Sequence, residues 1–266
     1  MNKEENVTRN ASSAPSDAVG ARSPKRFDTR ALVGNAMYTI GLMRVCGGVE
    51  DSAAVDRGGR GKIHQQADRR ADATTDHFRL WMKHGADSPE TRAAVAKVAQ
   101  LHSHYAQSYS MSNDTFVRGI ALFATLFEEV THLVGLDLLS ARQKSAQVAH
   151  WLAIGEQLGV RNIPQTWAGM KHANWVYEHD AVNFRPTPEG KRCADSLIRQ
   201  FNERWLPRPL HPIGRVVLLS LQPDHVLVAV GQKKPPAPLV VLVRAVIRVS
   251  AKLAQRGKRR RRAAAR

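Results

Sequence analysis

The sequence predicts an all-α protein, and three observations support this class. Apolar residues recur at three- and four-residue spacings through most of the body of the chain. Helix-capping residues and glycines separate the periodic segments. No alternation of strand and helix patterns, no Gly-rich phosphate loop and no internal repeat interrupts them. We therefore expect a single multi-helix domain over residues 27–255.

The two ends of the chain differ in composition from this body. Residues 1–26 are rich in Ser, Ala, Asn and charged residues and poor in large apolar ones, which predicts a disordered segment. Residues 256–266 read RGKRRRRAAAR, with seven positive charges and no acid, and predict a basic disordered tail. The net charge of the chain is +17. The basic tail therefore also predicts a peripheral contact with an anionic membrane.

Capping signals mark where the expected helices begin and end. Ser88 precedes a proline at a helix start, and Ser140 with Gln143 forms a capping box. The apolar runs 216–222 and 226–231 fit helix or strand by periodicity alone, and we favour helix from the context. The other segments predicted as helices are 28–46, 62–85, 89–107, 114–135, 141–159, 166–182 and 188–205.

The cysteines and the hydropathy of the chain indicate its cellular compartment. Cys46 and Cys193 are far apart and belong to no CxxC motif, which argues against a disulfide framework and a structural zinc site. No segment has the apolar core of a signal peptide or the uninterrupted apolar length of a membrane span. We therefore expect a cytoplasmic protein.

Two histidines in the stretch LHSHY are the first candidate site residues. A helix turns about 100° per residue, so His102 and His104 point in nearly opposite directions. His102 shares a face with Val95, Val98 and Tyr105, whereas His104 lies on a more polar face. His102 is therefore the candidate buried imidazole. The alternative is a core histidine that only hydrogen-bonds a backbone carbonyl.

A second candidate constellation lies on the preceding helix. Arg70 and Thr74 are spaced i, i+4, so their side chains meet on one face, and Asp72 and Asp76 flank them. An arginine and a hydroxyl together can hold an anion, or an oxygen atom bound to a metal. The alternative is an exposed helix face with salt bridges.

Several short segments in order carry a resemblance to a known family. These are RRADAT at 69–74, the helix with LHSHY, SNDTF at 112–116 and LGVRNIP at 158–164. Their order and spacing resemble the MpaB/rubber-oxygenase catalytic domain family, which includes latex clearing protein. The resemblance covers about residues 28–230.

The resemblance implies a globin-like helical core around haem b. It implies that Arg70 and Thr74 are catalytic residues beside the haem, and that the axial ligand of the iron is His102 or His104. The helical-face argument prefers His102. The implied activity is oxidation of a hydrophobic, isoprenoid-type substrate by dioxygen. Ala73 stands where rubber oxygenases have a distal lysine, so the resemblance does not imply the polyisoprene reaction itself.

Two other function classes stay open beside the haem-dependent oxygenase. One is a non-catalytic helical protein that binds an anionic membrane or nucleic acid through its basic surface and tail. The other is a catalytically inactive protein of the same fold. The basic residues of the body are dispersed and no nucleic-acid motif is present, which argues against nucleic acid.

Overall fold

Helices form nearly all of the regular structure. The computed structural model describes the backbone of residues 28–264 and the side chains up to residue 257, so the expected disordered segment 1–26 lies outside the described residues. The described chain contains twelve α-helices, one 3₁₀ helix and no strand, and this confirms the all-α prediction. The helices are α1 (Thr29–Val45), α2 (Val49–Asp56), α3 (Lys62–Gln65), α4 (Ala67–His84), α5 (Pro89–Ala106), α6 (Asn113–Leu133), α7 (Ala141–Gln157), α8 (Trp167–His179), α9 (Pro188–Trp205), η1 (Arg208–Leu210), α10 (His211–Ser220), α11 (Asp224–Ala229) and α12 (Ala237–Ala264).

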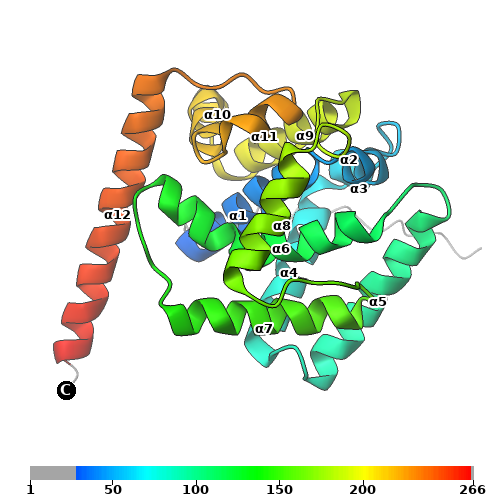
Figure 1. Ribbon diagram of the computed structural model, residues 1–266. Coiled ribbons are helices and arrows are strands. Elements are labelled where there is room, and N and C mark those ends of the chain that lie inside the picture. The colour runs from blue at the N-terminus through cyan, green and yellow to red at the C-terminus, as the bar shows by residue number, and fades with distance from the viewer. Residues whose placement is uncertain (1–27, 265–266) are drawn as a thin grey trace, which may run out of the picture.

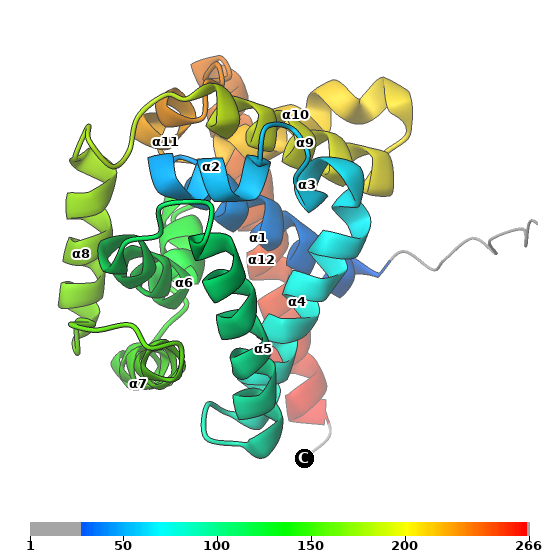
Figure 2. The same ribbon diagram turned by 90° about the vertical axis from the view of Figure 1, so that its right-hand side faces the viewer.

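Helix α6 occupies the centre of the domain (Figure 1). It packs against α8, α7 and α1, while α9 packs against α1 and α2. Helices α4 and α5 lie side by side and extend away from α9 (Figure 2). This arrangement places the faces of α4, α5 and α6 around a common space.

The apolar core has two main clusters that meet at α6. The first joins α1, α6, α9 and α10 and contains Met43, Leu122 and Leu197, which are at most 1% exposed. The second cluster joins helices α4, α5, α6 and α7 and contains Trp151 and Ile154. Partly buried Phe123 packs on both clusters, so they form one continuous core in a single domain.

The structure corrects the predicted elements between residues 47 and 85. Gly48 follows the predicted helix 28–46, and it is also the N-cap residue of the short helix α2. This helix was not predicted. The expected helix 62–85 is broken at Gln66, whose backbone φ of −138° and ψ of 48° are not helical. The two ambiguous apolar runs lie in α10 and α11, as favoured from their context.

Helix α12 lies along one edge of the molecule in Figure 1, and the view in Figure 2 places it behind the other helices. Its backbone continues to Ala264, so it includes most of the segment expected as a disordered tail. None of the described helices has the length and apolar content needed to cross a bilayer.

Candidate functional site

A cavity of about 490 Å³ lies where the faces of three helices meet. Its lining residues recur at helical spacing on each of them. Helix α4 contributes positions 69, 70, 73, 74, 77, 78 and 81; α5 contributes 98, 101, 102 and 105; and α6 contributes 115, 116, 119, 120 and 123. The cavity is therefore built from continuous stripes and falls in the usual size range for small-molecule sites.

The cavity changes in polarity from one end of α4 to the other. The first half of α4 and the segment before it supply cations, and the second half supplies aromatic rings. The cationic lining residues are Arg57, Lys62, Arg69 and Arg70. The aromatic ones are Phe78, Trp81, Phe116, Phe123 and Trp151 from α4, α6 and α7, together with Tyr105 from α5. Such a cavity suits a ligand with a large apolar body and an anionic edge.

Three of the four predicted site residues line this cavity. Arg70 and Thr74 lie on the cavity stripe of α4, and His102 lies on that of α5. His104 does not line the cavity and is exposed on the opposite side of α5. The flanking residues Asp72 and Asp76 are also exposed and lie off the stripe.

His102 has the environment of a neutral imidazole. Its ring lies 5.1 Å from that of Phe116, measured between centroids, and burial lowers the pKa of its side chain. A neutral imidazole keeps a free nitrogen lone pair, which a metal requires of a histidine ligand.

Several buried polar atoms at the cavity have no hydrogen-bond partner among the described residues. They are Asp51 Oδ2, Arg57 Nε, Arg70 Nε and Trp81 Nε1, and all four residues belong to the lining. Unpaired buried polar groups are rare in folded proteins because they lose the hydrogen bonds of water. Their concentration at one cavity indicates a polar ligand or ordered solvent there.

Gly119 leaves open space at the centre of the α6 stripe. A Cβ atom built at this position would meet no atom within 4 Å outside its own helix. Because Gly119 also lines the cavity, a flat ligand could approach the α6 backbone at this point. No sequence signal distinguished Gly119 from the other glycines.

Asp51 is a cavity residue that the sequence analysis missed. Burial raises the pKa of its carboxyl to about 7, although the Arg118 guanidinium, with Nη1 at 3.6 Å, acts to lower it. A buried carboxyl with this pKa can hold or release a proton near neutral pH. Asp51 lies on the unpredicted helix α2, far from the recognised segments in sequence.

Arg57 and Tyr105 form a contact in the cavity lining that sequence reasoning also missed. The Arg57 guanidinium lies 4.9 Å from the centre of the Tyr105 ring, and its Nη1 donates to Tyr105 Oη at 3.2 Å. This contact joins the C-terminal end of α2 to α5. It holds a cation beside His102, one helical turn from Tyr105.

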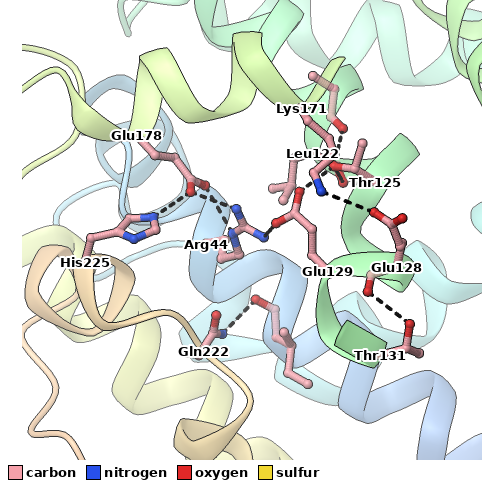
Figure 3. Close-up of polar contacts among 12 residues, drawn as sticks. Arg44, Leu122, Thr125, Glu128, Glu129, Thr131, Lys171, Glu178, Gln222 and His225 are labelled. Carbon is pink, nitrogen blue, oxygen red and sulfur yellow. Dashed lines mark hydrogen bonds and ion pairs between the residues drawn. The ribbon is translucent and has the colours of Figure 1, made fainter. Parts of the chain in front are cut away.

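A second hollow, of about 560 Å³, lies on the other side of α6, beside α8 and α11. Its floor is a buried charge cluster (Figure 3). Arg44 donates to Glu178 at 3.1 and 2.7 Å and to Glu129 at 2.5 Å, and His225 contacts Glu178 at 2.8 Å. Although burial raises the pKa of Glu178, Arg44, His225 and Arg118 hold it well below its usual range.

Arg118 separates this hollow from the cavity. Its Nη2 donates to Glu178 at 2.8 Å, while Nη1 faces Asp51 on the cavity side. The side chain is 1% exposed, and its charge is compensated by these two carboxyl groups, by the backbone oxygen of Arg44 and by the faces of the Tyr177 and Phe184 rings. The cluster therefore fixes the relative positions of α1, α2, α6, α8 and α11.

Two other groups contain metal-type ligands, and both are already paired with cations. In the first, Asp56 accepts bonds from Arg192 at 3.0 and 2.7 Å, and His64 bridges it to Ser196. This Ser–His–Asp alignment lines neither hollow, and Ser196 is 4% exposed, so it is a structural connection.

The second group consists of Glu128, His132 and Asp137. Lys144 contacts Glu128 at 2.5 Å. Lys171 contacts the same carboxylate at 3.4 Å (Figure 3). A dication would have to compete with two ammonium groups for this carboxylate. The cavity with His102 is therefore the better candidate for a cofactor.

The structure is that of an all-α protein with an internal cavity of mixed polarity. Residues 34–252 match the family model described as "ER-bound oxygenase mpaB/B'/Rubber oxygenase, catalytic domain". The match covers most of the chain, and the protein belongs to this family, which confirms the resemblance. Membership makes it an oxidoreductase of the oxygenase type. No curated protein matches the sequence.

Proposed function

We propose that the protein is a haem b-dependent oxygenase that uses dioxygen to oxidise a hydrophobic substrate of the isoprenoid type. The observation that carries the proposal is the meeting of Arg70, Thr74 and His102 at one cavity. Arg70 and Thr74 lie one turn apart on α4, His102 lies on α5, and the sequence pattern indicates all three as site residues. Family membership supports the oxygenase activity, and the cavity supports the cofactor.

The residues around the cavity fit a haem group. His102 would be the protein ligand of the iron, because burial favours its neutral form. The open space at Gly119 and the aromatic wall would accommodate the flat porphyrin, and the cationic lining would attract its carboxylates. When bound, the haem iron would supply the binding and activation of dioxygen.

The remaining lining residues would shape the reaction. Arg70 and Thr74 would donate hydrogen bonds to oxygen atoms on which negative charge develops, and such donors are strongest where water is excluded. Asp51 would hold a proton close to the cavity. The apolar faces of α4 to α7 would hold the substrate, and Ala73 leaves the cavity without a lysine at that position.

Haem binding by the full-length protein tests the proposal. We expect purified protein to develop a saturable Soret band when haemin is added. His102→Ala should lose or shift this band, because the other lining histidine, His77 on α4, has its Nδ1 bonded to the backbone oxygen of Ala73. His104→Ala is the matched control on the same helix, and it should keep the wild-type spectrum.

Two results would contradict parts of this proposal. A wild-type protein that stays colourless with haemin would exclude haem as the cofactor. A changed spectrum for His104→Ala, with that of His102→Ala unchanged, would show that the axial ligand is His104.

We also propose a cytoplasmic location, with a peripheral contact between residues 256–266 and an anionic membrane. The basic composition of this segment supports the contact, because each Lys or Arg near an anionic surface contributes about 1 kcal/mol.

A further inference from the structure

Helix α12 is fixed to the domain by one face. Val240 is buried, and Ile247 and Ala251 pack on the main core cluster. On the same side, Arg244 Nε donates to the backbone oxygen of Ser220 at 2.9 Å, and Arg248 Nε donates to that of Val134 at 2.6 Å. Positions 240, 244, 247, 248 and 251 follow helical spacing, so the packed face is well defined.

The opposite face of α12 carries an unpartnered apolar stripe. Its members are separated by three and four residues in alternation and are 41% to 59% exposed: Leu239, Leu242, Val246, Val249 and Leu253. We call these residues the α12 stripe. Isolated exposed apolar residues are common, whereas a continuous row along one helix marks an interaction surface.

The charge of α12 is entirely positive. Residues 237–264 contain nine Lys and Arg residues and no Asp or Glu. Lys252 and Arg256 are exposed, and their positions on the helix flank the α12 stripe. The helix thus combines an apolar row with a basic flank, which is the pattern of helices that lie in the plane of a membrane interface.

We infer that α12 docks the domain on an anionic lipid bilayer by inserting its stripe at the boundary between headgroups and acyl chains. This extends the contact proposed for residues 256–266 from an electrostatic attachment to an apolar insertion. It does not depend on haem binding. The inserted stripe and the packed face point in opposite directions, so the domain can remain folded while it is docked.

The charges of α12 favour an anionic bilayer as its partner over a second copy of the chain or a nucleic acid. A second copy of the chain would place two helices, each with nine cations and no acid, against each other. Like charges beside an apolar seam oppose such pairing. A nucleic acid would neutralise the cations but would leave the stripe in water. A bilayer with anionic headgroups satisfies both features together.

Vesicle binding by the full-length protein tests the inference. We expect cosedimentation with vesicles of phosphatidylcholine containing about 30% phosphatidylserine, and weaker binding to phosphatidylcholine alone. Val246→Gln should lower the partition coefficient roughly tenfold, because it removes one buried apolar side chain. Val241→Gln is the matched control, since Val241 is 68% exposed on the same helix but lies off the stripe. It should change binding by less than about twofold.

Three outcomes would overturn the inference. One is equal loss of binding in Val246→Gln and Val241→Gln. Another is a wild-type dimer that Val246→Gln converts to a monomer, without vesicle binding, which would assign the stripe to a second copy. The third is vesicle binding that added DNA abolishes and that Val246→Gln does not change. The haem spectrum of Val246→Gln should equal that of wild type. A failure of the membrane inference can therefore be distinguished from a failure of the oxygenase proposal.

Discussion

Asp51 has an environment that favours the protonated form of its carboxyl group. Its side chain is mostly buried beside the cavity, and the nearby Glu50 carboxylate adds to the effect of burial on the pKa. Hydrogen bonds from Ser110, Thr115 and Ser112 outweigh the burial of Glu50 and lower the pKa of that neighbour to about 2. The two adjacent acids on α2 thus have very different pKa values, and of the two, Asp51 is the one suited to proton exchange near neutral pH.

The raised pKa of Asp51 predicts the sign of a pH effect on stability. Between the unperturbed value of 3.8 and about 7, the folded state holds a proton that the unfolded state has released. Stability from this site therefore falls as pH rises through that window. Asp51→Asn should be more stable than wild type at pH 8, and this advantage should shrink toward pH 4.

Urea unfolding of both proteins at several pH values measures this effect. Asp195→Asn provides a contrast of opposite sign. Although partial burial raises the Asp195 pKa, hydrogen bonds from Lys191 and Gln232 lower it below its usual value. Its replacement should cost stability mainly at higher pH. A stability difference for Asp51→Asn that does not vary with pH would contradict the assignment.

At the scale of elements, the boundaries of the helices follow local chemistry. Ser88 caps α5 by accepting from the Thr91 amide, and Ser140 with Gln143 forms the expected capping box of α7. Gly85 and Gly159 adopt the left-handed φ values of 81° and 79° at helix ends. These predictions hold because a cap depends on residues within one helical turn.

The cavity stripe of α6 predicts the effect of a larger residue at Gly119. Gly119→Leu should fold with equal or greater stability, because leucine favours a helix over glycine by about 1 kcal/mol and meets no atom at its Cβ. The side chain should nevertheless occupy part of the cavity. We expect the affinity for haemin to fall by about tenfold or more, on the scale at which buried side chains act.

Thermal unfolding and haemin titration measure both parts of this prediction. Gly34→Leu is the matched control, because Gly34 is also a helical glycine with no atom within 4 Å of a built Cβ, and it does not line the cavity. Wild-type haemin affinity in a folded Gly119→Leu protein would show that the cofactor does not lie against α6.

At the scale of the whole molecule, a buried ion cluster ties distant helices together. Glu178 on α8 is the common partner of Arg44 on α1 and His225 on α11 (Figure 3), and of Arg118 on α6. Its removal would leave two buried guanidinium groups without their main counter-charge. Breaking a buried ion pair from one side is far more costly than losing an exposed one.

Glu178→Gln should therefore lower the free energy of unfolding by about 3–5 kcal/mol. Glu189→Gln is the control, because Glu189 pairs with Arg192 within one turn of α9 and is partly exposed. It should cost no more than about 1 kcal/mol. Chemical denaturation measures both, and equal effects of the two substitutions would show that the cluster does not organise the fold.

The elements that sequence reasoning missed depend on distant contacts. Helix α2 is too short to be stable alone, and it forms where it packs on α9. The break at Gln66 follows from tertiary contacts as well, since His64 is held by Asp56 and Ser196. Neither contact leaves a periodic signal in the local sequence.

The sequence by itself determined the helical class, most helix boundaries and the inward faces that carry Arg70, Thr74 and His102. These features depend on periodicity and capping, which operate over a few residues. Only the tertiary structure decided that these three residues meet at one cavity, that Asp51 and Gly119 belong to it, and that the α12 stripe stays uncovered. The physical reason is that burial and ionisation depend on which faces pack together, and residues distant in sequence supply those faces.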